Sequence, residues 1–168
     1  AILSCMILPA LMLTGGAAAA DLIHENIVIV SNDDFTPDNG VVAGAGTKAD
    51  PYIIEGWELQ FNIGDGITIR NTDAYFLIRE VHAHSSNAGI SLYNVANGRV
   101  EGCLLDNNSF GIYVRDSKDC RITNNTFSDN YYGIFCWNCA SVKTDKNVFV
   151  DNVENVYVPT KSEPWERT

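Results

Sequence analysis

Short runs of alternating apolar and polar residues recur through most of the chain. A Gly-Ile pair opens each unit, and successive pairs are 23, 22 and 22 residues apart, at Gly66, Gly89, Gly111 and Gly133; Asn155 opens a fifth unit in place of glycine. Apolar residues two positions apart indicate short strands with one face turned inward. Asn, Asp and Gly turns separate these strands and leave no room for long helices. The pattern predicts a solenoid of stacked coils.

The inward-facing positions form columns when the units are aligned on the glycine as position 1. Positions 2 and 4 are almost entirely aliphatic, and positions 12 and 17 are largely apolar, so these four columns are the expected core. Their members are Ile67, Ile90, Ile112, Ile134 and Val156; Ile69, Leu92, Val114, Cys136 and Val158; Ile78 (allowing one inserted residue), Val100, Ile122 and Thr144; and Ala83, Leu105, Phe127 and Phe149.

Position 20 is an asparagine column, with Ser86 followed by Asn108, Asn130 and Asn152. Stacked coils lie about 4.8 Å apart, so each side-chain amide can bond the amide of the next coil. Asparagine also tolerates the left-handed backbone that a sharp corner requires. The column therefore predicts a structural ladder at a corner, and Asn125 is interpreted in the same way.

The repeat resembles that of the right-handed parallel β-helix, which is shared by pectin-lyase-like proteins and by NosD-like periplasmic and cell-surface proteins. The resemblance covers about residues 52–158, and residues 44–57 (GAGTKADPYIIEGW) resemble the opening turn of NosD-like β-helices of prokaryotic surface proteins. It implies an all-β fold, a right-handed parallel β-helix solenoid with coils of about 22 residues from a single chain and an N-terminal cap. It does not select a function, because lyases, hydrolases, metal-related proteins and structural walls share this repeat.

The organisation predicted along the chain has four parts. Residues 1–20 are uncharged, apolar and end in four alanines, which is typical of a signal peptide whose basic n-region is missing. Residues 21–51 form an N-terminal strand and loop cap, residues 52–158 form the coils, and residues 159–168 are a C-terminal tail or a truncated next coil. We expect a fragment of an exported protein that is secreted, periplasmic or on the cell surface.

The net charge of the chain excludes some classes of binding partner. The chain has 11 Lys and Arg against 21 Asp and Glu, a formal net charge of −10. Phosphate backbones and anionic lipids would repel it, so we expect no nucleic-acid partner. We also expect no membrane span in the mature chain. The expected partners are a polysaccharide or glycoconjugate, a second copy of the chain, or neighbouring surface proteins.

Outward positions of the first strand carry the most distinctive side chains. Positions 3 and 5 bring aromatic and arginine residues of successive coils side by side, and a contiguous aromatic patch on a surface calls for an explanation. One interpretation is a carbohydrate platform, on which rings pack against sugar C–H faces while polar groups bond hydroxyls. The other is that a loop, a tail or a neighbouring subunit covers this face. The platform residues are Tyr93, Tyr113, Arg115, Phe135, Trp137 and Tyr157.

A second candidate is the histidine pair His82 and His84, which share one face of a strand, with Asp106 expected beside His84 in the next coil. Two imidazoles and a carboxylate could hold Zn²⁺ or Cu²⁺. Two solvated surface histidines are the alternative, and no other cofactor is expected. The cysteines are core residues by default, and a disulfide between Cys120 and Cys139 is the alternative.

Catalysis is the remaining question. Asn71-Thr72-Asp73 matches one motif of pectin-lyase-like hydrolases, but the sequence lacks their Gly-His-Gly and Arg-x-Lys motifs. We therefore predict a non-catalytic module that binds carbohydrate or builds a surface layer, and whether the full protein is an enzyme stays open. The alternatives are a fragment of a polysaccharide lyase or hydrolase and a NosD-like periplasmic protein associated with copper handling. Two glycosylation sequons also occur, at Asn107 and Asn124, with Asn124 favoured as acceptor.

Overall fold

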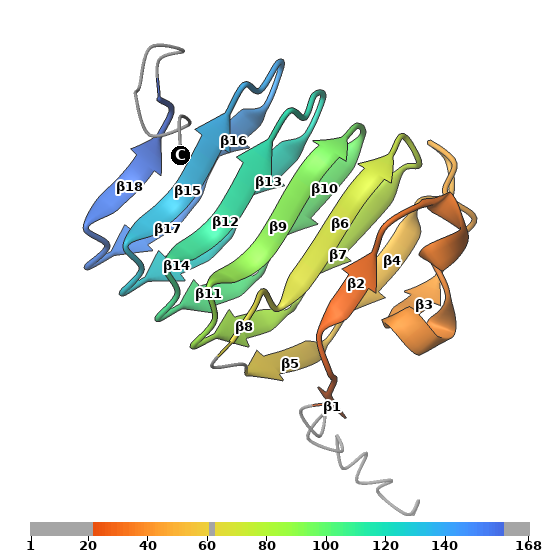
Figure 1. Ribbon diagram of the computed structural model, residues 1–168, viewed down its shortest axis with the longest axis horizontal. Helices are drawn as coiled ribbons and strands as arrows, with labels where there is room; N and C mark the ends of the chain where they lie inside the picture. Colours follow the sequence, from red (N-terminus) through yellow and green to blue (C-terminus); the bar gives the residue numbers. More distant parts are fainter. Residues whose placement is uncertain (1–21, 61–62, 160–168) are drawn as a thin grey trace, which may run out of the picture.

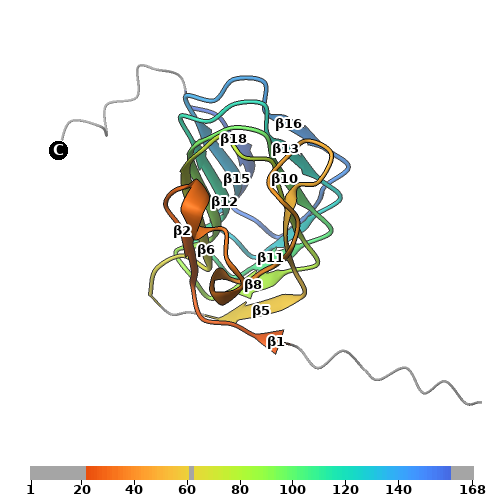
Figure 2. The same ribbon diagram turned by 90° about the vertical axis from the view of Figure 1, so that its right-hand side faces the viewer.

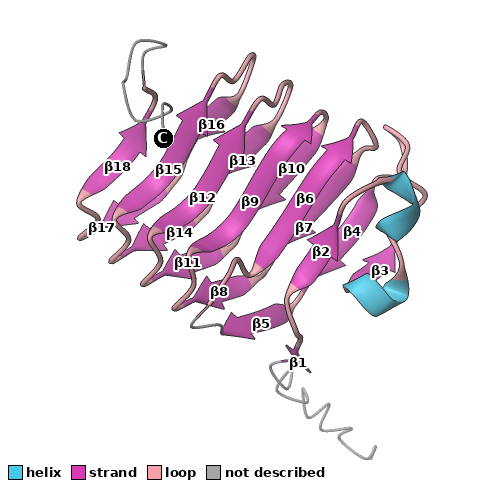
Figure 3. Cartoon of the chain, viewed as in Figure 1, coloured by secondary structure: helices cyan, strands magenta, loops and turns pink. Residues whose placement is uncertain are grey.

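The computed structural model describes residues 22–60 and 63–159 (Figure 1). The expected signal peptide, residues 1–20, and all but the first residue of the expected tail lie outside the described residues. Within the described part, strands and turns dominate, with two short 3-10 helices, η1 (Asn32–Asp34) and η2 (Pro37–Asn39) (Figure 3). Among the described residues, no helix has the length and apolarity needed to cross a bilayer.

Three sheets of six strands each form the sides of the solenoid. Viewed along its length, the chain coils around a common interior (Figure 2). Sheet A contains β1 (Leu22–Ile23), β5 (Trp57–Gln60), β8 (His82–His84), β11 (Leu104–Asp106), β14 (Thr126–Ser128) and β17 (Val148–Val150). Sheet B contains β2 (Ile27–Ile29), β6 (Ile67–Thr72), β9 (Ala88–Val95), β12 (Phe110–Arg115), β15 (Tyr132–Trp137) and β18 (Glu154–Tyr157). Sheet C contains β3 (Val41–Ala43), β4 (Tyr52–Glu55), β7 (Phe76–Arg79), β10 (Gly98–Glu101), β13 (Arg121–Thr123) and β16 (Lys143–Asp145).

The register between coils confirms the predicted columns. Ile112 pairs with Ile90 on one side and Ile134 on the other, and Val100 pairs with Ile78 and Ile122. The inward residues of the central coils are fully or nearly fully buried. Toward the C-terminal end the prediction of a buried column was wrong, since Thr144 is exposed, Val156 is 38% exposed and Val158 is 63% exposed. Burial of these columns is the main favourable contribution to folding, because it removes a continuous apolar strip from water.

The repeated glycine is required by close packing between coils. A β-carbon on Gly111 would lie 2.6 Å from the carbonyl oxygen of Gly133 and 2.6 Å from a ring carbon of Phe127, and the other three glycines of the column face the same kind of contact. A side chain at this position would therefore push against the backbone of the next coil. This steric constraint explains why the Gly-Ile pair marks the period.

The asparagine column is confirmed as a buried ladder. The Nδ2 group of Asn130 donates to the Oδ1 of Asn152 (2.9 Å) and to the carbonyl of Leu105 (2.8 Å), while its own Oδ1 accepts from the backbone N–H and Nδ2 of Asn108. Asn125 and Asn147 form a second ladder at another corner. Each amide satisfies backbone groups that a tight corner would otherwise leave unpaired.

The left-handed corners do not fall on the ladder residues, so that part of the prediction was wrong. The left-handed residues precede them, as at Asn107 (φ 54°) before Asn108 and Asp129 (φ 55°) before Asn130. The exposed residue makes the turn, which lets the next side chain point inward and bond along the ladder. Asn124 (φ 57°) is exposed in the same way before Asn125.

The N-terminal segment contributes to all three sheets. β2 pairs parallel with β6, β1 pairs parallel with β5, and β3 pairs antiparallel with β4. Phe35 stacks on Tyr52 with ring centroids 4.4 Å apart, so the η1–η2 segment packs against the N-terminal end of the core. The apolar interior at this end is thereby covered, as the stability of a solenoid requires.

Candidate functional site

Aromatic side chains collect on the outer face of sheet B, where strands β9, β12, β15 and β18 lie side by side (Figure 1). The register places Tyr113 beside Phe135 and Phe135 beside Tyr157. The Tyr113 and Phe135 rings stack at 5.2 Å with planes 15° apart, and Tyr93 adds a tilted ring 5.2 Å from Tyr113. The aromatic residues of the predicted platform thus form a continuous row along the coils, apart from Trp137.

A second row of rings, which the sequence interpretation missed, runs beside the first. Phe110 and Tyr132 stack at 5.4 Å and 11°, and each makes an edge contact with Phe135. Both residues immediately precede the glycine of their unit. The flanking coils have Ala88 and Glu154 at this position. The column that precedes the glycine is therefore aromatic in only two coils, which makes it easy to overlook in the sequence.

The two rows enclose an open groove of about 500 Å³. Five partly exposed rings and the buried Phe135 line it, together with the exposed amide of Asn87. Burial raises the pKa of the Tyr93 phenol, so this hydroxyl is neutral and able to donate a hydrogen bond at neutral pH. The ring residues of the groove are Tyr93, Phe110, Tyr113, Tyr132, Phe135 and Tyr157.

Two predicted platform residues do not line the groove, although Arg115 hydrogen-bonds Tyr113, which does. Trp137 pairs with Arg115 at the end of the strands, and neither residue lines the groove. Although both Phe135 and Trp137 were expected to point to solvent, they are only 5% and 8% exposed. Alternation alone places a side chain on the outer face of a sheet, but neighbouring side chains decide whether that position is exposed. Phe135 is enclosed by the rings on either side, so it forms the floor of the groove.

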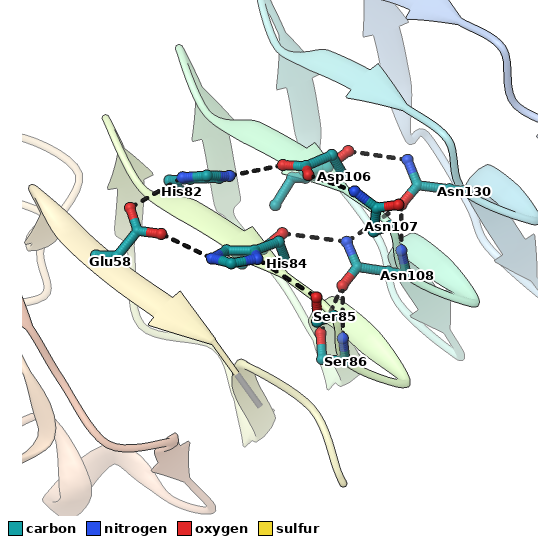
Figure 4. A network of polar contacts seen from close by, with 11 residues as sticks. Glu58, His82, His84, Ser85, Ser86, Asp106, Asn107, Asn108 and Asn130 are labelled. Atoms are coloured by element: carbon teal, nitrogen blue, oxygen red, sulfur yellow. Dashed lines mark hydrogen bonds and ion pairs between the residues drawn. The ribbon is translucent and has the colours of Figure 1, made fainter. Parts of the chain in front are cut away.

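The histidine pair lies on the outer face of sheet A (Figure 4). Strand pairing places Asp106 beside His84, as predicted, but its carboxylate contacts His82, with Oδ1 2.6 Å from Nε2. Glu58 on β5, which the sequence interpretation missed, lies 2.9 Å from His82 Nδ1 and 2.8 Å from His84 Nε2. The two imidazole rings stack with centroids 4.5 Å apart.

A third region surrounds the Asn71-Thr72-Asp73 motif. An open groove of about 550 Å³ runs along this corner of the coils, past Asp116 and Lys118. Asn71 (φ 56°) and Asp116 (φ 50°) both belong to a column of left-handed corners. The amide of Asn94 donates to the Oδ1 of Asn71 (3.0 Å), so these side chains bond from coil to coil. The left-handed turns and the bonds between coils therefore explain why polar residues recur at this corner.

The four described cysteines are free thiols, and they differ in how deeply they are buried. Burial raises the pKa of Cys103 to about 12 and that of Cys120 to about 11. Cys139 is half-buried, and a hydrogen bond with Cys136 lowers its pKa. Cys103, Cys120 and Cys136 therefore pack as small core residues, in agreement with the default interpretation, and the Cys120–Cys139 disulfide is not formed.

Comparison with known proteins agrees with this architecture. A family model described as "Right handed beta helix region" matches residues 18–162, which spans all three sheets. No curated protein and no solved structure matches the chain.

Proposed function

The chain belongs to the right-handed β-helix family, and from this premise we propose that it is a non-catalytic carbohydrate-binding module of an exported or surface-displayed protein. The observation that carries the proposal is the aromatic groove on the outer face of sheet B. A contiguous aromatic surface on a rigid sheet is typical of a binding site, because solvated proteins rarely expose one without a partner.

Sugars fit the chemistry of this groove. Each pyranose has C–H faces that pack on aromatic rings and a rim of hydroxyls that need hydrogen bonds, and tyrosine offers both an apolar ring and a polar hydroxyl. The groove combines four tyrosines with Phe110, Phe135 and the Asn87 amide. Successive coils repeat the rings 5.2 to 5.4 Å apart, from Tyr93 to Tyr113, Phe135 and Tyr157. An extended polysaccharide lying along the solenoid would therefore meet similar contacts at each coil.

The groove supports binding in preference to cleavage. Among the described residues that line it, none supplies a carboxylate or an imidazole. Glycoside hydrolysis generally requires a pair of carboxyl groups on either side of the scissile bond. The aromatic and amide groups of this groove can hold and orient a chain, but they supply none of the carboxyl groups that such hydrolysis uses.

Charge favours a neutral ligand. The formal net charge of the chain is −10, which repels polyanions such as uronic acid polymers at low ionic strength. The groove itself presents uncharged side chains. We therefore assign the site to neutral polysaccharides or glycoconjugates, in an extracellular, periplasmic or surface setting.

A binding experiment on the full chain tests this proposal. Neutral, acidic and amino polysaccharides would be screened by glycan array, followed by calorimetry on the best ligand. Tyr113→Ala should reduce affinity about tenfold or more, because the variant loses one central ring contact and opens its neighbours to water. Tyr75→Ala is the control, since Tyr75 lies between β6 and β7 and does not line the groove. Its affinity should stay within about twofold of the parent.

Two results would overturn the proposal. One is the same affinity for Tyr113→Ala and Tyr75→Ala, which would place the sugar elsewhere. The other is no binding to any polysaccharide combined with self-association that Tyr113→Ala abolishes, as measured by sedimentation velocity. The second result would assign the aromatic face to assembly of a surface layer.

A further inference from the structure

We propose that Glu58, His82 and His84 form a binding site for a divalent transition-metal ion on the outer face of sheet A, with Asp106 holding His82 in the binding orientation. This site lies on a different sheet from the aromatic groove and does not depend on the carbohydrate proposal. A ligand set drawn from the sequence pattern alone would contain Asp106 as a ligand, but the structure places the Glu58 carboxylate beside both imidazoles, with one oxygen against each (Figure 4).

The backbone brings the three groups together without strain. His82 and His84 are two residues apart on β8 and so share its outer face, and strand pairing sets Glu58 directly beside His82. One donor atom from each of the three residues lies within 4.8 Å of the others. An ion bound at about 2.0–2.2 Å would need the donor atoms about 3.3 Å apart in tetrahedral geometry, which small side-chain rotations can reach.

The orientation of His82 is fixed from the side away from Glu58. Its Nε2 lies 2.6 Å from the Oδ1 of Asp106, and the Oδ2 of Asp106 accepts a hydrogen bond from Asn107 Nδ2 (2.9 Å). An imidazole that donates Nε2–H to a carboxylate presents the Nδ1 lone pair on its other side, and metal-binding histidines are commonly held in this manner. The Nδ1 of His84 is likewise 3.4 Å from the hydroxyl of Ser85.

With these outer hydrogen bonds made, the inner atoms form a cation site. In the ion-free arrangement each inner nitrogen hydrogen-bonds a different oxygen of Glu58, Nδ1 of His82 to Oε2 and Nε2 of His84 to Oε1, and these three groups offer ligand atoms within 4.8 Å of one another. A bound cation would replace the protons of these two hydrogen bonds and take both nitrogens and the carboxylate as ligands. The side chains are 20 to 33% exposed, so an ion can enter from solvent while the groups remain partly desolvated.

The donor set selects the class of ion. Two imidazole nitrogens with one carboxylate suit Zn²⁺, Cu²⁺ or Ni²⁺, whereas Mg²⁺ and Ca²⁺ prefer oxygen ligands alone. Three protein ligands also leave at least one position for water or a further ligand. The site should therefore bind Zn²⁺ in preference to Mg²⁺ or Ca²⁺ and keep an open coordination position.

The test is titration of the untagged full chain with Zn²⁺ by calorimetry, with Co²⁺ absorption spectra as a second readout. One equivalent should bind, and visible Co²⁺ bands should indicate coordination by imidazole nitrogen. Glu58→Gln and His84→Ala should each weaken binding about 100-fold or more, and Asp106→Asn should weaken it about 10- to 100-fold. His24→Ala is the control, because it removes the remaining histidine of the chain from a position against Trp57 and should leave binding unchanged.

Folding would be checked for every variant by circular dichroism and thermal unfolding without metal. The altered side chains lie on the outer face of sheet A, so the variants should keep the β-rich spectrum. The proposal is overturned if micromolar Zn²⁺ does not bind, if Mg²⁺ competes equally, or if Glu58→Gln and His84→Ala leave the affinity at the parent value.

Discussion

The outer faces of sheets A and B are built on the same coils, yet they present opposite chemistry. Sheet B displays rows of aromatic rings, whereas sheet A displays imidazoles and carboxylates around His82. Strand length explains part of the difference. β12 and β15 have six residues each, but β11 and β14 have three, so each coil gives sheet B more outward positions than sheet A. A wide face can form a groove, and a narrow face can form only a compact cluster.

The comparison also separates the repeated from the unrepeated part of the sequence. Inward columns are constrained by packing between coils, so they stay largely apolar from one unit to the next even where the side chain changes in size, as from Ala83 to Leu105 and Phe127. Outward positions have no such constraint, and each face takes its chemistry from a few coils only. The function of this molecule is therefore sought in side chains that interrupt the repeat, such as Glu58 and Phe110.

The largest expected effect is on stability and comes from a change that disturbs the packing between coils, on which both faces depend. Gly111→Ala should lower the free energy of unfolding by about 3 kcal/mol, because the added methyl group meets the Gly133 carbonyl and the Phe127 ring at 2.6 Å. Chemical denaturation would measure it. Ser109→Ala, at an exposed position two residues earlier, is the control and should change stability by less than about 0.5 kcal/mol. Equal effects of the two variants would contradict the steric account.

A smaller but similar effect is expected at the corner that joins sheet A to sheet B. Asn130 is 2% exposed and links Asn108, Leu105 and Asn152. Asn130→Ala should destabilise the fold by about 2 kcal/mol, because buried backbone groups lose their partners.

Asp129→Asn is the matched control for the ladder, since the adjacent residue is exposed and asparagine accepts its left-handed backbone. Urea unfolding should show little change for this variant. If Asn130→Ala were as stable as Asp129→Asn, the ladder would be dispensable and the two faces would be held by the core columns alone.

The stability of the core should depend on pH through Cys103, which is buried between β10 and β11. Its pKa in the folded state is about 12, because burial disfavours the thiolate, against an ordinary value of 9.0. Below pH 9 the thiol is protonated in both states and stability is unaffected. As the pH rises from about 9 toward 12, the unfolded chain ionises first, so the free energy of unfolding falls, by about 1 kcal/mol at pH 10.

Measuring the free energy of unfolding against pH for the parent and for Cys103→Ala isolates this contribution. The difference in free energy of unfolding between the two proteins should shrink above pH 9. Only the parent has a thiol at position 103 that ionises more readily in the unfolded state than in the folded state. Parallel pH profiles would show that Cys103 ionises as freely in the folded state as in the unfolded one.

The smallest expected effect is the coupling between the two faces. Their residues occupy different sheets, and substitutions at separated sites without shared partners are usually additive. His84→Ala should leave polysaccharide affinity within about twofold, and Tyr113→Ala should leave Zn²⁺ affinity within about twofold. Calorimetry on each variant with each ligand measures both. A larger cross-effect would show that the solenoid transmits a change from one face to the other.

The sequence by itself determined the architecture. The 22-residue period, the apolar columns and the asparagine ladder all follow from the printed residues, because a strand alternates its side chains and a stacked coil repeats its neighbours. The same logic placed Tyr93, Tyr113 and Tyr157 on one outer face.

Only the tertiary structure decided how the outward side chains meet. Glu58 precedes the first Gly-Ile unit, so no aligned column assigned it a neighbour, and strand pairing alone sets it beside His82. Asp106 pairs with His84 along the backbone but reaches His82 with its carboxylate. Periodicity constrains the backbone and the face of each side chain, whereas side-chain rotation and enclosure by neighbours determine which groups touch and which are exposed.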